Sequence, residues 1–184
     1  MNKILILSNT AFSIEKFREH YLSKIYNYDF LIYTPNLKPK LKKKYKHIKT
    51  RKFRSKNLFD DFYQLYKILK KNKTTEIIVY SYKYQLIISL LKKIFKIKLN
   101  IISIIAGLGS FHLGNVFKKN FLYLVSKFIV NSSKYIICIN PQDLDYFKKL
   151  SQEKKFFQLP TEGIDSNFKL EKKINKKRNF IFFA

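Results

Sequence analysis

Short apolar runs alternate with longer segments of helical periodicity along most of this chain. The run Lys3 to Leu7 has the length of a strand, and the segment Ile14 to Tyr26 that follows it repeats its apolar residues with the spacing of a helix. The same alternation continues as far as the run Lys155 to Leu159. It predicts further strands at Asp29 to Tyr33, Glu76 to Tyr80, Asn100 to Ile105 and Tyr135 to Ile139, and further helices at Leu58 to Leu69, Gln85 to Phe95, Phe117 to Val130 and Pro141 to Leu150.

This alternation is typical of βαβ units, in which parallel strands form one sheet and helices cover it. We therefore expect an α/β fold, a Rossmann-like parallel sheet with helices on both faces. The lysine-rich stretch Pro35 to Lys56 is the least periodic part, and we interpret it as a solvated loop with an edge strand near His47 to Phe53. The apolar stripe expected on one helix consists of Leu58, Phe62, Leu65, Tyr66 and Leu69, and that on another of Phe121, Leu122, Leu124, Val125, Phe128 and Ile129.

Open sheets of this kind bind ligands at the carboxyl ends of their strands. Two of the four glycines in the chain, Gly107 and Gly109, directly follow the predicted strand Asn100 to Ile105. Glycine permits a positive φ and lets backbone N–H groups approach a ligand closely. The rim expected at this edge consists of Ser8, Asn9, Thr10, Ser81, Tyr82, the segment Ala106 to Phe111, and Asn140.

Several familiar site patterns are absent or have a structural explanation. No G-x-G-x-x-G pattern occurs, which disfavours a dinucleotide site of that type. Asp143 and Asp145 form a D-x-D pattern, which some metal-dependent sugar transferases of a different fold use to hold a cation. Here Asn140 and Pro141 have the types expected at a helix start, so we favour a helix-stabilising role for Asp143 over metal binding. The histidines are too scattered to suggest a metal site, and His112, beside the glycine loop, is interpreted as a loop residue.

The composition predicts one domain of ordinary size with a substantial core. The chain has 184 residues, of which 46% are hydrophobic. Its apolar runs are far shorter than the ~20 residues needed to cross a bilayer, and no signal-peptide pattern opens the chain. Cys138 is the single cysteine and lies in an apolar run, so a buried, inert thiol is favoured over a nucleophile.

The net charge of +26 favours contact with an anionic partner such as a nucleic acid. However, the excess of Lys, Asn, Ile, Phe and Tyr is also typical of an A/T-rich genome, which raises the charge without selecting for a partner. Nucleic-acid recognition favours the arginine fork, whereas almost all cations here are lysines. An anionic membrane leaflet explains the charge at least as well, because each cation near such a surface contributes ~1 kcal/mol.

Four segments together resemble a known family. They are KILILSNTAFSIEKFR, AGLGSF, YIICINPQDLDYF and LPTEGIDSNF. They are similar to the N-terminal half of family 4 retaining glycosyltransferases, which have the two-Rossmann GT-B fold, and most of all to members that extend lipid-linked sugars in capsule, O-antigen or N-glycan precursor assembly. The matching positions are Ser8, Asn9, Thr10, Phe17, Arg18, Gly107 to Ser110, Asn140, Pro141, Asp143, Phe147, Gly163 to Asp165 and Phe168.

The resemblance implies roles for some of these residues, while the catalytic residues stay unassigned. Residues 1–170 correspond to the acceptor-side Rossmann-like domain, and residues 171–184 to a linker and the first strand of a C-terminal domain that holds the donor-phosphate residues. No metal or other cofactor is implied. The implied acceptor-binding residues are Ser8, Asn9, Thr10 and Arg18, and the residues implied to face the donor cleft are Gly107, Leu108, Gly109, Ser110, Asn140, Gly163 and Asp165.

The resemblance thus implies a fragment of a glycosyltransferase that transfers sugar from a nucleotide-sugar donor to a glycan or lipid-linked acceptor. We expect it to be inactive without its donor-binding domain, cytoplasmic, and peripheral on the inner face of the cell membrane. Two alternatives stay open. One is a non-catalytic membrane-surface subunit that recruits a separate donor-binding chain, and the other, less favoured, is a basic nucleic-acid-binding protein.

Overall fold

The computed structural model describes residues 2–9, 22, 24–25, 27–35, 47–53, 57–72, 74–108, 116–151 and 155–159. From residue 48 onward, strands and helices alternate within these ranges as the sequence predicts. The strands are β1 (Asn2–Leu7), β2 (Tyr28–Thr34), β3 (Ile48–Lys52), β4 (Glu76–Val79), β5 (Asn100–Ile105), β6 (Tyr135–Cys138) and β7 (Phe156–Gln158), and the helices are α3 (Leu58–Asn72), α4 (Tyr82–Ile94), α5 (Val116–Ser132) and α6 (Pro141–Lys148).

All seven strands form one parallel sheet in the order β3-β2-β1-β4-β5-β6-β7. The chain starts at β1 and adds β2 and β3 on one side. It then returns to add β4 on the other side of β1, where Leu7 is in register with Val79. The direction in which strands are added therefore reverses between β1 and β4. That position is the topological switch point of the sheet, where ligands bind in open α/β folds.

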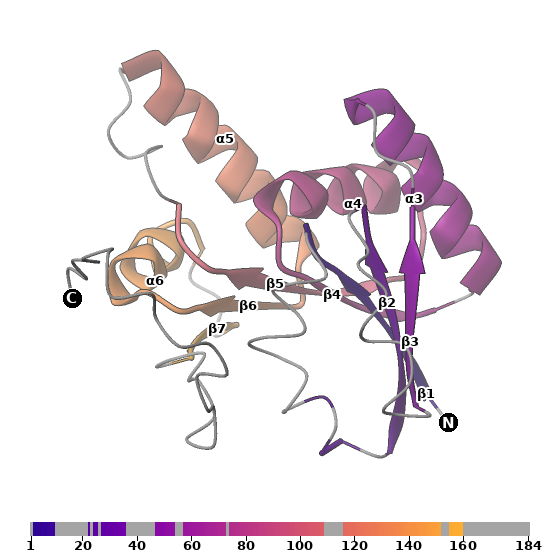
Figure 1. Ribbon diagram of the computed structural model, residues 1–184. Helices are drawn as coiled ribbons and strands as arrows, with labels where there is room; N and C mark the ends of the chain where they lie inside the picture. The colour runs from indigo at the N-terminus through magenta and orange to yellow at the C-terminus, as the bar shows by residue number, and fades with distance from the viewer. Residues whose placement is uncertain are drawn as a thin grey trace, which may run out of the picture.

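The described helices pack on one face of this sheet. Leu5 and Leu7 of β1 lie in one core cluster with residues of α3 and α4, such as Leu65 and Ile88. A second cluster joins the β5–β6 end to α5 and α6, for example through Leu122. Figure 1 shows α3, α4 and α5 beside one another over the sheet. The α/β, Rossmann-like architecture expected from the sequence is confirmed.

The opposite face is also apolar. Ile6 and Ile32, which alternate with the inward-facing residues of the first cluster, pack with Phe30 and with Leu22. Leu22 comes from the predicted helix Ile14 to Tyr26, most of which lies outside the described residues. The Nε2 atom of His47, before β3, lies 3.1 Å from the carbonyl oxygen of Leu22 and links that segment to the edge of the sheet.

Two predicted apolar stripes were wrong in part. On α3, Leu58 is 54% exposed, and Asp61 is fully buried one helical turn before Leu65. On α5, Leu122 and Ile129 are buried as predicted, but Phe121 and Leu124 are 60% and 64% exposed. A helix packed on a sheet buries one stripe, whereas α5 carries apolar residues around more of its circumference. No described helix has an apolar stretch long enough to cross a bilayer.

Candidate functional site

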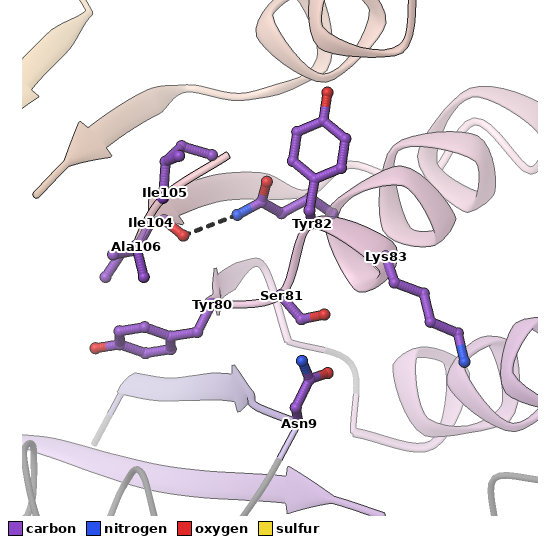
Figure 2. A pocket seen from close by; sticks show the side chains of 10 residues that line it. Asn9, Tyr80, Ser81, Tyr82, Lys83, Ile104, Ile105 and Ala106 are labelled. Atoms are coloured by element: carbon purple, nitrogen blue, oxygen red, sulfur yellow. Dashed lines mark hydrogen bonds between the residues drawn. The ribbon is translucent and has the colours of Figure 1, made fainter. Parts of the chain in front are cut away.

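A pocket of about 260 Å³ opens at the switch point of the sheet. It lies at the carboxyl ends of β1, β4 and β5, where Figure 2 shows Asn9, Tyr80, Ser81 and Ala106 close together. Parallel strands end at the same edge, so residues far apart in the chain meet here. The lining residues are Asn9, Tyr80, Ser81, Tyr82, Lys83, Gln85, Ile104, Ile105, Ala106 and Gly107.

The start of α4 forms the electropositive side of the pocket. Ser81 precedes the helix in an extended conformation, with φ −105° and ψ 128°, and its side chain makes no capping hydrogen bond. The first turn contains no acidic residue and contains Lys83. A helix N-terminus presents backbone N–H groups and the positive end of the helix dipole. This side of the pocket therefore favours an anionic or strongly hydrogen-bond-accepting group.

Gln85 fixes the floor of the pocket. Its Nε2 atom donates hydrogen bonds to the carbonyl oxygens of Val79 and Ile104, each at 3.0 Å. Gln85 is fully buried, and its Oε1 atom has no hydrogen-bond partner among the described residues. One side chain of α4 thus holds the ends of β4 and β5 in a fixed relation to the helix.

Tyr82 provides a rigid aromatic wall. Its hydroxyl lies 2.6 Å from Oγ of Ser126 on α5, and the Tyr146 hydroxyl of α6 donates to the same oxygen at 3.3 Å. Burial raises the pKa of Tyr82 to about 12, against the opposing hydrogen bond from Ser126 and with a smaller contribution from Tyr146. The phenol therefore stays neutral near pH 7. Tyr82 can pack against a ligand, and its hydroxyl stays bound to Ser126.

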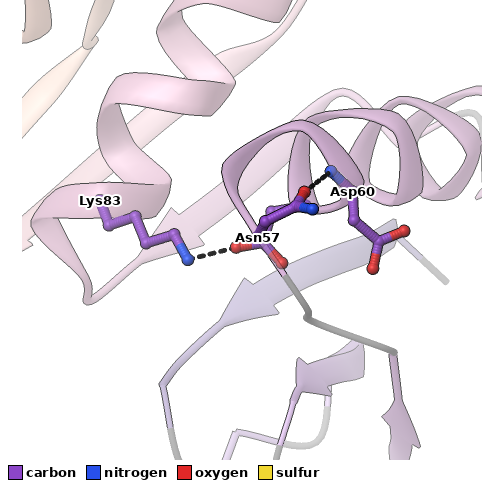
Figure 3. A network of polar contacts seen from close by, with 4 residues as sticks. Asn57, Asp60 and Lys83 are labelled. Carbon is purple, nitrogen blue, oxygen red and sulfur yellow. Dashed lines mark hydrogen bonds and ion pairs between the residues drawn. The ribbon is translucent and has the colours of Figure 1, made fainter.

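Lys83 is paired with a buried carboxylate. Its ammonium group forms an ion pair with Asp61 of α3, shown in Figure 3 as the contact from Lys83 toward the start of α3. Asp61 is fully buried, whereas the side chain of Lys83 is 43% exposed. Asn57 caps this helix by accepting a hydrogen bond from the backbone N–H of Asp60 at 2.8 Å. The ion pair joins the first turns of two neighbouring helices beside the pocket.

Gly107 lies close to the first turn of α6. Gly107 has φ +140°, a conformation that favours glycine, as the sequence predicts. A Cβ at this position would lie 4.0 Å from Oδ2 of Asp143. Asn140 caps α6 by accepting a hydrogen bond from the N–H of Gln142 at 2.8 Å. The capping role predicted for Asn140 is confirmed.

The D-x-D pattern does not form a joint carboxylate pair. Asp143 is 2% exposed and packed near the glycine loop, while Asp145 is exposed on another side of the same helix. In the part of the chain that the structure describes, no group of three or more His, Cys, Asp or Glu residues could hold a metal ion. Burial, and secondarily the charge of Asp143, raises the pKa of the buried Cys138 thiol to about 12. The predicted burial of this thiol is confirmed.

The pocket contains part of the site predicted from the sequence. Asn9 and Gly107 line it. Ser8 lies next to Asn9 but is 2% exposed, and its N–H donates to the carbonyl of Tyr33 at 3.2 Å. Leu108 is buried in the core cluster beneath α5 and α6, and Asn140 lies at the start of α6. Thr10, Arg18, Gly109, Ser110, Gly163 and Asp165 lie outside the described residues.

The sequence did not assign a role to Lys83, Gln85 or Asp61. The helix was predicted to begin at Gln85, whereas it begins at Tyr82, which places Lys83 in the first turn at the pocket. Two signals were present. Gln85 and Asp61 are polar residues on otherwise apolar helix faces, and Ser81 has the residue type of a helix cap.

Solved structures of sugar-nucleotide enzymes share this fold. Sucrose-phosphate synthase from Thermosynechococcus elongatus superposes with a TM-score of 0.64 at 11% identity over 87% of this chain and 48% of that one. UDP-N-acetylglucosamine 2-epimerase from Rickettsia bellii gives 0.59 at 14% identity over 86% and 44%. The lipopolysaccharide outer core galactosyltransferase WaaB gives 0.58 at 12% identity over 84% and 44%. No protein-family model and no curated protein sequence matches the chain.

At these identities the similarity shows the fold. The chain has a GT-B-like, Rossmann-type fold of the kind found in glycosyltransferases and related sugar-nucleotide enzymes. It spans about half the length of each of these three structures.

Proposed function

We propose that this chain is the acceptor-side lobe of a family 4-like retaining glycosyltransferase. Together with a donor-binding lobe, it would form an enzyme that transfers a sugar from a nucleotide-sugar donor to a glycan or lipid-linked acceptor in surface-polysaccharide or glycan-precursor assembly. The observation that carries the proposal is the pocket at the switch point between β1 and β4, in a fold shared with a galactosyltransferase. The four sequence segments that resemble this enzyme family support it.

The pocket has chemistry suited to a sugar substrate. Tyr82 offers an aromatic wall, and Asn9 and Ser81 offer polar groups that can bind hydroxyls. Lys83 and the start of α4 favour a phosphate. The groups that bind the leaving diphosphate of the donor would belong to a second lobe, on the same polypeptide or on a separate chain. In such a cleft, dipoles and basic side chains can neutralise the leaving group without a metal ion.

The exposed face of α5 supports attachment to an anionic membrane surface. Val116 and Phe117 are 74% and 81% exposed, and Phe121 and Leu124 follow them on the same helix. Lys118, Lys119 and Lys127 add positive charge to the exposed surface of this helix. Apolar side chains flanked by cations are the pattern of an interfacial helix that lies on a membrane. This arrangement would hold the pocket near a lipid-linked acceptor on the inner face of the cell membrane.

A binding experiment tests the acceptor assignment. The purified chain is titrated with farnesyl-diphosphate-linked N-acetylglucosamine and followed by NMR. We expect saturable binding that Tyr82→Ala weakens and that the control Tyr123→Ala, an exposed change on α5, leaves unchanged. Equal binding by both variants would refute the pocket as the acceptor site.

Sugar transfer by the chain alone is expected to be negligible, and measurable transfer would contradict the need for a second lobe.

The similarity to UDP-N-acetylglucosamine 2-epimerase favours a second candidate, a lobe of a nucleotide-sugar epimerase. An epimerase converts a nucleotide sugar without an acceptor, whereas a transferase needs one. Incubation of the chain with UDP-N-acetylglucosamine, in lysate from its source cell and without added acceptor, distinguishes the two. Chain-dependent appearance of an epimeric nucleotide sugar would favour the epimerase.

A further inference from the structure

Lys83 is the only cationic side chain among the described residues that line the pocket. Its position in the first turn of α4 would allow it to bind an anion there. In the structure, however, its ammonium group is engaged by Asp61. Figure 2 shows the side chain extending from the start of α4 away from Tyr80 and Ser81. The positive charge of Lys83 is thus directed away from Tyr80 and Ser81.

The ion pair with Lys83 stabilises the buried carboxylate of Asp61. It is fully buried, and apart from the ammonium of Lys83 no described donor reaches either of its carboxylate oxygens. A buried carboxylate without a counter-ion is costly. The first turn of α3 offsets part of that cost, because a helix N-terminus stabilises negative charge. Asp61 can therefore stay buried at this position when the ammonium group moves away, although the free energy of this arrangement is less favourable than that of the ion pair.

The pocket offers a competing position for the same ammonium group. The first turn of α4 contains no acidic residue, and a phosphate bound at its start would attract the 43%-exposed side chain of Lys83. On the other side of the pocket, Asp143 is buried behind Gly107 and is not among the residues that line the cavity. A change in the side-chain conformation of Lys83 would move its ammonium group from Asp61 to the phosphate.

We propose that the ammonium group of Lys83 pairs with Asp61 before the substrate binds, and that it moves to a phosphate group of the substrate on binding. The identity of that phosphate as part of a sugar substrate rests on the proposed function, but the exchange itself does not. Asp61 is then a competitor of the ligand and a positioning residue, whereas Lys83 contacts the ligand. Removal of the Asp61 charge should strengthen phosphate binding, which is opposite to the effect of damaging a structural contact.

Calorimetric titration with inorganic diphosphate tests the exchange. We expect Asp61→Asn to tighten binding at least about fivefold, the lower end of typical coupling between two sites. Lys83→Gln should weaken binding by a similar factor, and the double variant should bind like Lys83→Gln alone. Two controls make the same changes of charge elsewhere, Asp145→Asn on α6 and Lys93→Gln at the far end of α4, and both should match the unmodified chain.

Two further titrations identify the source of the phosphate. UDP represents the donor, and farnesyl diphosphate represents a lipid-linked acceptor. The ligand that reaches the pocket is the one that binds more tightly to Asp61→Asn and more weakly to Lys83→Gln. Unchanged or weaker diphosphate binding in Asp61→Asn, with its fold retained by circular dichroism, overturns the exchange. Unchanged binding in the double variant also overturns it, and that variant leaves no buried unpaired charge. If diphosphate shows the expected order while no sugar substrate binds, the exchange stands and the proposed function fails.

Discussion

Gln85 binds the backbone of Ile104 through its side chain, with Nε2 donating to the carbonyl oxygen at 3.0 Å. The same nitrogen donates to the carbonyl oxygen of Val79, so one amide joins α4 to the ends of two strands at the pocket. We predict that Gln85→Met, which keeps the length of the side chain, leaves two carbonyls without this donor. The expected loss is about 2–4 kcal/mol in the free energy of unfolding, measured in urea.

The matched control for this change is Gln142→Met. Gln142 is exposed in the first turn of α6, and the hydrogen bond that it makes to Asn140 uses its backbone N–H. This variant should lie within about 0.5 kcal/mol of the unmodified chain, as surface substitutions usually do. A loss of the same size in both variants would show that the bridge does not stabilise the sheet.

The Lys83 and Asp61 pair should show strong coupling in stability. Lys83→Met leaves the fully buried carboxylate of Asp61 without its counter-ion, and we expect a loss of about 2 kcal/mol. This is less than for a fully buried pair, because the Lys83 side chain is 43% exposed. Adding Asp61→Asn to Lys83→Met should restore most of the loss, as measured by urea unfolding of the four species in a double-mutant cycle. An additive cycle would rule out direct coupling.

The sequence predicted the architecture because parallel strands covered on both faces are continuously apolar. Runs such as Asn100 to Ile105 therefore stand out from the amphipathic helices between them. Ligands of such sheets bind at the carboxyl ends of the strands, and this rule depends only on strand direction. It therefore predicted the edge of the sheet at which Asn9 and Gly107 line the pocket.

The rest of the site depends on tertiary contacts that no local pattern records. Gln85 reaches Ile104 across 19 positions of the chain, and Asp61 meets Lys83 only because α3 and α4 pack side by side. The exposure of Phe121 was also not predictable from periodicity, because an apolar position on a broad stripe can face a neighbour or solvent.

The stability of the folded chain should fall in alkaline solution. The pKa of Cys138 rises from 9.0 to about 12 and that of Tyr82 from 10.0 to about 12, in each case mainly through burial. Above pH 9.0 the unfolded chain loses the thiol proton while the folded chain keeps it until about pH 12. The unfolded state then binds fewer protons, so the free energy of unfolding decreases as the pH rises through this window.

Cys138→Ala removes one of these contributions. Its free energy of unfolding should fall less steeply than that of the unmodified chain, by up to about 1.4 kcal/mol per pH unit between about pH 9 and pH 11. The comparison uses slopes, because the small cavity left by the substitution lowers stability at every pH. Urea unfolding at several pH values measures the slopes. Parallel curves for the two proteins would contradict a thiol that stays protonated in the folded state.

The exposed residues of α5 should matter for membrane binding and little for folding. We predict that Phe117→Ser combined with Phe121→Ser and Leu124→Ser lowers affinity for phosphatidylglycerol-containing vesicles at least about tenfold, because each buried side chain contributes roughly 1–2 kcal/mol. Vesicle cosedimentation measures this effect. Phe59→Ser, at an 86%-exposed site on α3, is the control and should bind as the unmodified chain does. Unchanged binding by the triple variant would exclude this face as the membrane anchor.

Asn140 combines a demonstrated capping role with a predicted place in the donor cleft, and two substitutions separate them. Asn140→Ala removes the oxygen that accepts the Gln142 N–H and should cost about 1 kcal/mol in the free energy of unfolding. Asn140→Asp keeps a cap oxygen and should retain nearly full stability. It also adds a negative charge near the glycine loop, so it should weaken binding of UDP-N-acetylglucosamine if the residue faces the donor, as measured by calorimetry. A stable Asn140→Asp variant with undiminished affinity would leave Asn140 as a helix cap alone, since a carboxylate beside a bound diphosphate must repel it.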